Sequence, residues 1–338
     1  MAVTLAQIAA LAGVSRGTVD RALNNRGRVD AKVAARIRRI AAELGYRPNR
    51  AGRQLALAKN PIKIGVIIQS VETMFMNSVL RETEASLTRF SSLGAEVLLR
   101  PMEGVDVDRQ LALIDELVAA GIEGLAITPA EGVRDRLNEL GERMPVVLFN
   151  TDLPDCKRFC YIGQDSYQGG RACAKLMDLL LGGCGKVLVI AGQELNWAHR
   201  KRVEGFCDEA ARKFPGLMVL PPETCGDDQQ LAHDIICEAA MLHPDLGGVY
   251  VSVNGQIGAC NALRELHVGG KIHLICHDLT PENADNVRAG LIDFLIDQDA
   301  HLQGVRPVEL LLDYLLVGER PPSKSILAQI QMYNAYNI

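Results

Sequence analysis

The chain has 338 residues, of which 48% are hydrophobic, and its formal net charge is −5. That length leaves room for a small domain and a two-lobed body of about 275 residues with two cores. Nothing resembles a secretion signal, and the longest apolar runs are too short to span a membrane, so we expect a cytoplasmic protein without a membrane partner. Nine cysteines, an odd number without a C-x-x-C pair, fit a reducing compartment.

Positive charge is concentrated at the amino terminus. Residues 1–60 contain twelve Lys or Arg and three acidic residues, a net charge of +9, so the remaining residues carry −14. A polyanionic partner explains this asymmetry, because each phosphate that a protein neutralises releases condensed counterions. The alternative is an Arg-rich helical surface that is merely solvated, and the pattern of helices described next disfavours it.

The same region predicts three short helices. Leu5–Ala12 has apolar residues at helical spacing, and Gly13 suits a left-handed turn. Ser15 is expected to cap a second helix with an exposed polar side, and a third helix is expected to run from a cap at Asp30 to Gly45. Two helices around a tight turn form the helix-turn-helix arrangement, whose second helix reads the major groove of DNA.

Residues 3–58 contain the pattern V-T-L-A-Q-I-A-x-L-A-G-V-S-x-x-T-V-x-R-x-L-N, followed by G-Y-R-P-N. This pattern resembles the head of the lactose-repressor (LacI/GalR) family of bacterial transcription regulators. The resemblance implies base contacts from Arg16 and Arg21, which suit guanine, whereas Gly17 has no side chain and Asp20 departs from the family's usual Ser. It implies these DNA-binding residues: Thr4, Ser15, Arg16, Gly17, Thr18, Arg21, Asn24, Asn49, Arg50, Arg53 and Leu55.

The resemblance extends to a hinge helix at residues 47–60, behind an all-α head at residues 1–46. In the family, paired hinges fold on DNA and push a leucine, here Leu55, into the minor groove. Such a wedge is costly unless the bent DNA contacts more protein. Gly52 stands where relatives usually have Ala, and Gly inside a helix costs roughly 0.5–1 kcal/mol. An ordinary linker with one buried leucine is the alternative.

From residue 62 onward, short apolar strands alternate with amphipathic helices, the pattern of a parallel α/β sheet. The expected helices include Asp108–Ala120 and Tyr167–Leu181. The expected strands are Ile62–Gln69, Ala95–Leu99, Ile122–Thr128, Val146–Phe149, Val187–Ala191, Gly248–Val253 and Ile272–His277.

Motifs for cofactors and metals are missing from this pattern. No G-x-G-x-x-G follows the first strand and no phosphate-binding loop occurs, so no cofactor is expected. The run Gly182–Gly185 precedes a strand and is interpreted as a turn. His273 and His277 are the one histidine pair spaced by four residues, but an expected strand would not place them as a helix does, so no metal site is expected.

The body also contains I-G-V-I-I at the first strand and the segments Pro145–Asn150, Ile162–Asp165, Arg200–Phe206 and Asp297-Gln298. These landmarks resemble the periplasmic sugar-binding-protein fold of the ribose-binding type, in which two Rossmann-like lobes hinge around a ligand cleft. The resemblance assigns residues 61–338 to an effector-binding and dimerisation domain. About 62–163 and 300–324 form the first lobe, and about 166–296 and 327–338 form the second.

Planar side chains with several hydrogen-bonding groups stand where the sugar contacts of relatives lie, and polyol hydroxyls need such partners. The implied effector-binding residues are Gln69, Thr73, Phe75, Asn150, Trp197, Arg202, Asn254, Asp278 and Gln298. Relatives commonly have Asp where this chain has Asn150, and an Asn-Asp pair where it has Asn254-Gly255. The cleft of this chain therefore lacks two acidic side chains, and a less anionic cleft would accommodate an acidic or phosphorylated ligand better. Nearby Glu72, Asp152 and Asp278 oppose this.

These features predict a transcription regulator, most often a repressor in this family, that binds pseudo-palindromic operator DNA as a homodimer and responds to a sugar, polyol or sugar derivative. The solute-binding protein of a sugar transporter is an alternative, opposed by the basic head. An α/β enzyme is a third. Glu72, Asp152 and Asp278 could form an acid–base pair, but no nucleophile elbow accompanies them.

Overall fold

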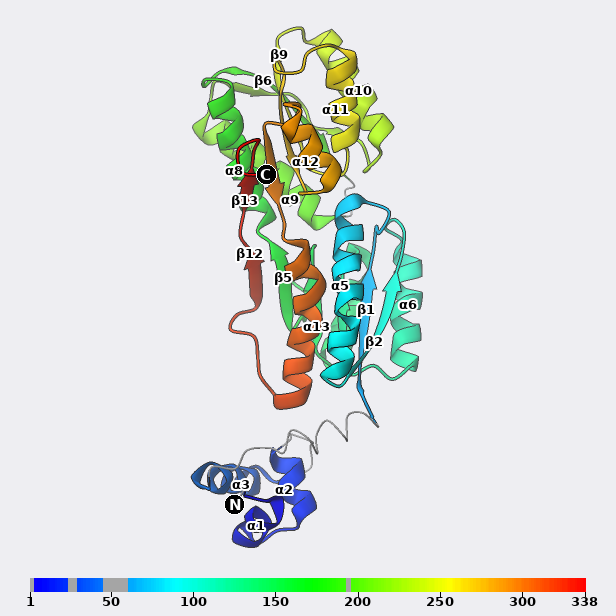
Figure 1. Cartoon of the computed structure of the whole chain (residues 1–338), viewed down its shortest axis with the longest axis vertical. Coiled ribbons are helices and arrows are strands. Elements are labelled where there is room, and N and C mark those ends of the chain that lie inside the picture. Colours follow the sequence, from blue (N-terminus) through cyan, green and yellow to red (C-terminus); the bar gives the residue numbers. More distant parts are fainter. Residues whose placement is uncertain (1–2, 24–28, 45–59, 193–195) are drawn as a thin grey trace.

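The computed structural model describes residues 3–23, 29–44, 60–192 and 196–338 (Figure 1). Its first unit consists of three helices: α1 (Leu5–Ala12), α2 (Arg16–Leu23) and α3 (Ala31–Glu43). They pack around the fully buried side chains of Ile8, Val19 and Ile37. The predicted helix-turn-helix arrangement is therefore confirmed. Leu44 is the C-cap of α3, and the expected end at Gly45 lies outside the described residues.

Local signals in the sequence set the ends of these helices. The Thr4 side chain and Gln7 form a capping box at the start of α1. Gly13 ends α1 with a φ of 66°, the left-handed conformation that glycine adopts without strain. The Ser15 hydroxyl accepts a hydrogen bond of 3.1 Å from the backbone N–H of Thr18 and so caps α2. The Asp30 carboxylate caps α3.

The body contains two largely parallel sheets. The first sheet has the order β12-β5-β4-β3-β1-β2, and all its neighbouring strands are parallel. Its strands are β1 (Ile62–Ile68), β2 (Ala95–Pro101), β3 (Gly124–Ile127), β4 (Val146–Phe149), β5 (Cys160–Gln164) and β12 (Ser325–Ala328). The helices α5 (Met74–Ser92) and α13 (Ala300–Val317) cover one face, and α6 (Val107–Ala119), η1 (Glu131–Val133) and α7 (Arg134–Gly141) lie on the other.

The second sheet has the order β13-β11-β10-β9-β6-β7, with β8 also paired to β6. Only the β11–β13 pair is antiparallel among these described strands. The strands are β6 (Gly185–Ala191), β7 (Leu217–Val219), β8 (Glu223–Thr224), β9 (Leu246–Val251), β10 (His273–His277), β11 (Phe294–Asp297) and β13 (Gln331–Tyr333). The helices are α8 (Ser166–Leu180), α9 (Trp197–Lys213), α10 (Gln229–Leu242), α11 (Gln256–Glu265) and α12 (Pro281–Arg288).

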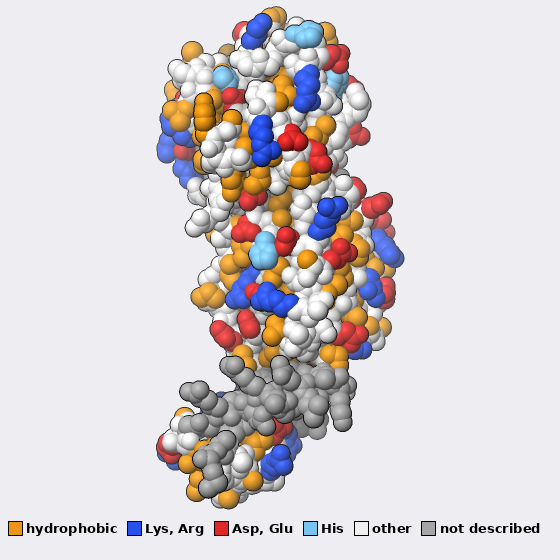
Figure 2. Space-filling view, in the orientation of Figure 1, with side chains coloured by type: hydrophobic (Ala, Val, Ile, Leu, Met, Phe, Trp, Pro, Cys, Tyr) orange, Lys and Arg blue, Asp and Glu red, His pale blue; other side chains and the backbone are white. Residues whose placement is uncertain are grey.

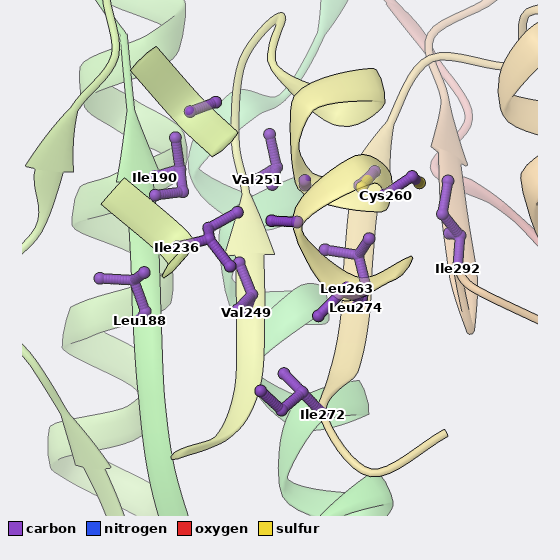
Figure 3. Packing of buried hydrophobic residues seen from close by; sticks show 14 of the residues in the cluster. Leu188, Ile190, Ile236, Val249, Val251, Cys260, Leu263, Ile272, Leu274 and Ile292 are labelled. Atoms are coloured by element: carbon purple, nitrogen blue, oxygen red, sulfur yellow. The ribbon is translucent and has the colours of Figure 1, made fainter. Parts of the chain in front are cut away.

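The core of the second lobe shows how these layers are held together. Leu188 of β6 and Val249 of β9 point toward Ile236 of α10 and Leu263 of α11 (Figure 3). All four side chains are at most 1% exposed. Burial of an aliphatic side chain of this size stabilises the fold by about 1.5–3 kcal/mol. Helices α8 and α9 pack on the opposite face of this sheet.

The chain crosses between the two sheets three times: after β5, after β11 and between β12 and β13. The third crossing was expected at residues 325–326. It instead follows Ala328, because Ile326 pairs with Ile162 of β5 and keeps the segment in the first sheet. The Gln164 side chain lies at all three crossings, since its amide donates to the carbonyls of Asp297 (2.7 Å) and Gln329 (3.2 Å).

The strands expected in the body are all present, within about two residues at most ends. The helices expected at 108–120 and 167–181 are α6 and α8. The expected turn before β6 lies at residues 181–183, with positive φ at Gly182 and Gly183, and Gly185 already begins the strand. Among the described residues, no helix is long and apolar enough to cross a membrane.

Candidate functional site

A small cavity of about 50 Å³ lies between the two lobes, at the carboxyl ends of strands from both sheets. Parallel strands bring their carboxyl ends to one edge, which is why residues far apart in the sequence meet here. The lining residues are Gln69, Ser70, Thr73, Phe75, Met76, Asn150, Asn196, Ala198, His199, Arg202, Asp227, Val253, Asn254, Asp278 and Gln298. Eight of the nine expected effector residues are among them. Trp197, the ninth, is not.

Arg202 is the central charged group of this cavity. It lies on α9 and is 3% exposed. Its Nη1 donates to the Ser252 carbonyl at 2.9 Å, and its Nη2 donates to Oε1 of Gln298. Its Nε–H is buried and has no hydrogen-bond partner among the described residues. A buried donor without a partner is costly, and a ligand oxygen that reached this group would remove the cost.

The carboxyl group of Asp278 is linked to Arg202 through the side chain of Gln298. The Gln298 amide donates to Oδ1 of Asp278, and Nε2 of Gln256 donates to Oδ2 of Asp278 at 3.3 Å. Burial is the main cause that raises the pKa of Asp278 to about 6, while the Arg202 charge and the Gln298 hydrogen bond oppose the shift. Asp278 is thus held as a hydrogen-bond acceptor whose charge depends on pH near neutrality.

Asp227 and Asn254 form the outer wall of the second lobe. The Asp227 carboxylate accepts from the backbone N–H of Asn254 at 3.1 Å, and the Asn254 amide donates to the Asp227 carbonyl at 2.9 Å. Burial raises the pKa of Asp227 as well. The Asn254 side chain is therefore engaged with its neighbouring loop, and it positions Asp227 at the cavity.

The first lobe contributes a polar wall supported from behind. Gln69 accepts from Nε2 of Gln110 at 3.2 Å, and the same Nε2 donates to the Thr128 carbonyl at 3.1 Å. The Asn150 amide donates to Oε1 of Gln303 at 3.2 Å. Asn150 has a φ of 65°, a left-handed conformation that turns the chain sharply at the end of β4.

Besides Ser70, three lining residues carry polar groups that the sequence analysis missed. Asn196 caps α9, because its Oδ1 accepts from the backbone N–H groups of Ala198 and His199. Burial, and then the Arg202 charge, lower the pKa of His199 to about 3, so its ring is neutral near pH 7. Asp227 is the third, after the two-residue strand β8. An Asn before a helix is a recognisable signal for a helix cap. A strand of only two residues, by contrast, gives no pattern in the sequence that would point to Asp227.

The charges of the cavity differ from the expectation of a less anionic cleft. Its lining contains one guanidinium and two carboxyl groups, Asp227 and Asp278. Asp152 is instead paired with Arg158, at 2.6 Å, and Glu72 accepts from the backbone N–H of Gly104. The lining thus gives no support to a preference for acidic ligands. Of Glu72, Asp152 and Asp278, which were considered for an acid–base pair, only Asp278 lines the cavity.

The exposed side of α2 carries the expected base-reading residues. Arg16, Gly17 and Arg21 are exposed, and Nε of Arg21 donates to the Gly17 carbonyl at 3.1 Å. The Thr18 hydroxyl lies 2.9 Å from that of Ser15. Five other expected DNA contacts lie outside the described residues: Asn24, Asn49, Arg50, Arg53 and Leu55. Most of the expected hinge at 47–60 lies there too.

Comparison with known proteins connects these two units. Residues 4–49 match the model of bacterial regulatory proteins of the lacI family, and residues 64–320 match a periplasmic binding protein domain. By its body the chain belongs to the periplasmic binding protein domain family, and its head is a lacI-family domain. The lacI-type head thus precedes the cavity-bearing body in one chain, as the resemblance implied.

Curated relatives support this family assignment. The chain is 27% identical over 338 residues to the transcriptional regulator CelR of Thermobifida fusca, covering 96% of this chain and 95% of that protein. It is 26% identical to the sucrose operon repressor of Streptococcus mutans, covering 57% of each chain. It is 35% identical to the lactose operon repressor of Escherichia coli over 37% of this chain and 34% of that one. The chain thus spans about half the length, or less, of these last two relatives.

Solved structures show the fold of the body of this lacI-family protein. A carbohydrate transporter solute-binding protein from Agrobacterium radiobacter, in complex with D-arabinose, superposes with a TM-score of 0.76 at 20% identity, covering 82% of this chain and 96% of that one. A glucose-galactose binding protein from Geobacillus stearothermophilus gives a TM-score of 0.75, also at 20% identity, covering 82% and 99%.

Proposed function

We propose that this lacI-family protein is a sequence-specific, DNA-binding transcription regulator whose operator affinity depends on a sugar or sugar-like effector in the inter-lobe cavity. The observation that carries the proposal is the presence of both parts in one chain: an exposed, capped helix α2 behind a tight turn, and a polar cavity between two lobes. Named relatives are repressors of sugar operons, so repression is the proposed direction.

The groups of the cavity favour a neutral polyol. They combine five amide side chains, a guanidinium, a neutral imidazole and two carboxyl groups with the apolar side chains of Phe75 and Met76. Each hydroxyl of a polyol donates and accepts, and its C–H groups need apolar contact. This arrangement therefore satisfies both kinds of surface on a sugar ring.

Effector entry requires the lobes to separate. The cavity of about 50 Å³ is much smaller than ligand sites, which are about 300–1,000 Å³ in volume. A ligand held by both lobes favours one lobe arrangement, and any difference in DNA affinity between arrangements then links effector to operator. No covalent chemistry forms part of this proposal. A pseudo-palindromic operator and a homodimer are included in it, because one head contacts only a few base pairs.

The test is a DNA titration of the full chain with and without a panel of sugars, polyols and their phosphates, chosen first by thermal shift. We expect at least one neutral sugar or polyol to raise the melting temperature and to change operator affinity. A chain lacking residues 1–60 should retain ligand binding and lose DNA binding. Ligand binding without any DNA binding by the full chain would favour a solute-binding protein instead.

A further inference from the structure

A second, larger cavity lies at the opposite end of the first sheet. Its volume is about 900 Å³, and it is lined by residues that immediately precede strands, among them Glu123 before β3, Pro145 before β4 and Lys324 before β12. The sheet is parallel, so its amino ends lie together. Strand β1 also begins at this end, and the backbone N–H of Glu123 donates to the carbonyl of Lys63 at 2.8 Å.

Basic residues predominate in the lining of this second cavity. It contains five cations and two carboxylates, Glu123 and Glu142. We call the following five residues the basic surface: Arg143, Lys157, Arg158, Arg320 and Lys324. A positive excess is unexpected here, because residues 61–338 carry a net charge of −14.

Three of these cations remain uncompensated. Lys157 pairs with Glu142, and Arg158 pairs with Asp152. By contrast, Arg143, Arg320 and Lys324 form no ion pair with any carboxylate among the described residues, and all three are exposed. Unpaired cations around an open concavity attract a polyanion more strongly than a surface of alternating charges does.

The surrounding structure holds these cations in place. The guanidinium of Arg320 lies 5.4 Å from the ring centroid of Tyr314 and 5.9 Å from that of Phe159. The Lys324 carbonyl accepts from Nη1 of Arg158 at 2.8 Å and from the backbone N–H of Tyr161 at 3.0 Å. The backbone that carries Lys324 is therefore fixed to β5, which lowers the entropy lost when its side chain binds an anion.

We propose that the basic surface binds backbone phosphates of DNA next to the base pairs that the head reads. The inference rests on the proposed function. It follows from placement and charge: the segment between Glu43 and Ile62 can span at most about 65 Å even when fully extended, and it joins the body at the same end of the sheet as the basic surface. Contacts of this type add affinity without reading sequence.

The test compares two triple variants of the full chain on a 40-bp duplex of mixed sequence, titrated from 50 to 300 mM salt. One variant carries Arg143→Gln, Arg320→Gln and Lys324→Gln. The control carries Arg109→Gln, Lys271→Gln and Arg288→Gln, three exposed cations that lie outside this cavity. Thermal unfolding checks that both variants fold.

We expect the first variant to lose about 2–3 units per protomer from the slope of log K against log salt, or about 5 for the proposed homodimer, because each phosphate contact contributes about 0.9. The control should keep the slope of the wild type. On a 16-bp duplex, which lacks the flanks, the two variants should bind alike. An unchanged slope of the first variant on the long duplex would overturn the inference. Stabilisation of the wild type by inorganic phosphate, together with unchanged DNA binding by the first variant, would also overturn it, because the surface would then be a small-anion site. If the wild-type chain does not bind DNA at all, the proposed function fails instead.

Discussion

At the scale of single residues, Arg202 shows how the cavity combines stability and binding. Two of its nitrogens satisfy acceptors inside the second lobe, and its Nε–H has no partner among the described residues. The fold therefore holds a charged side chain of which one donor is free for a ligand. Removing the side chain leaves the Ser252 carbonyl with one donor fewer, so stability and effector binding both depend on this residue.

We expect Arg202→Ala to abolish the effector response while operator binding without effector stays within about twofold. Each polar group left unpaired in a closed site costs about 1–3 kcal/mol, so effector affinity should fall by about 5–150-fold for each such group. DNA titrations with and without saturating effector measure this. Lys201→Ala, on the same helix but paired only with Glu204 at the surface, is the control. A normal effector response in the Arg202 variant would remove it from the site.

Asp278 makes a pH prediction with a definite sign. The pKa of this carboxyl group is about 6 in the folded chain, compared with the ordinary value of 3.8 that applies to the unfolded chain. Between these two pH values the folded state therefore binds more protons than the unfolded state. The free energy of unfolding therefore falls as the pH rises through this window, by up to about 3 kcal/mol. We expect Asp278→Asn to lose less stability than the wild type between pH 4 and 7. Urea unfolding measures this, with Asp285→Asn on the exposed side of α12 as control. Equal pH slopes would contradict the assignment.

Arg16 is exposed at the start of α2, and under the proposed function it reads a base. We expect Arg16→Ala to relax discrimination at one base-pair position by about 1–3 kcal/mol, the value of a bidentate contact with guanine. Competition against single-base operator variants tests this prediction. Arg39→Ala, on the exposed side of α3, should lower the affinity for all DNA sequences more evenly. A discrimination profile that Arg16→Ala leaves intact would show that α2 reads DNA through other residues.

At the scale of elements, the close contact of α8 with α9 positions Arg202. A Cβ at Gly170 would lie 2.0 Å from the Arg202 carbonyl, and one at Gly205 would lie 2.1 Å from the Tyr167 carbonyl. Both helices therefore approach each other through glycines. A side chain at either position must push the helices apart, which displaces the guanidinium from the cavity.

We expect Gly170→Ala to lower the free energy of unfolding by about 1–3 kcal/mol or more, since the clash exceeds the gain of about 1 kcal/mol in helix preference. Effector affinity should fall with it. Gly269→Ala is the matched control, because its Cβ would meet Leu291 at an ordinary 3.4 Å. Denaturant unfolding and effector titration measure both effects. Equal stability of the two variants would show that α8 and α9 tolerate separation.

Strong periodic signals made some elements predictable and left others hidden. The buried runs that became β1, β4, β6, β9 and β10 are apolar and bounded by polar residues, so the sequence predicts them well. The strands β11 and β13 span only four and three residues, and they form by pairing with each other across a long stretch of sequence. The pattern of neighbouring residues does not reveal such pairing, so these strands were not predicted. Asp227 was missed for the same reason. Residue by residue, the eight cavity residues that were found came from the family resemblance.

At the scale of the whole molecule, an ion pair between Arg200 and Glu131 joins the two lobes. Nη2 of Arg200 on α9 lies 3.0 Å from Oε2 of Glu131 on η1, while Arg134 of the first lobe contacts the other carboxylate oxygen at 3.3 Å. Both partners of the inter-lobe pair are about two-fifths exposed. Its contribution is therefore modest, of the order of 0.2–1 kcal/mol.

We expect Glu131→Gln and Arg200→Gln each to weaken effector binding by roughly 1.5–5-fold, because each removes a contact of the closed lobes. The effects of the two substitutions should not add in the double variant, and a double-mutant cycle measures this coupling. Arg134→Gln, which removes the ion pairs with Glu131 and Asp155 inside the first lobe, should leave effector affinity unchanged. Additive effects in the double variant would mean that the two side chains act independently.

The three crossings also determine the order in which the parts can be completed during synthesis. Strand β12 lies at the edge of the first sheet, and α13 packs on α5, where the Thr83 hydroxyl donates to the Gly304 carbonyl at 2.9 Å. Domains generally fold as they leave the ribosome, amino-terminal parts first. The three-helix head ends at α3, whereas the first lobe is complete only when β12 (Ser325–Ala328) has been made. A nascent chain therefore has its DNA-reading part long before it has a complete ligand-binding lobe.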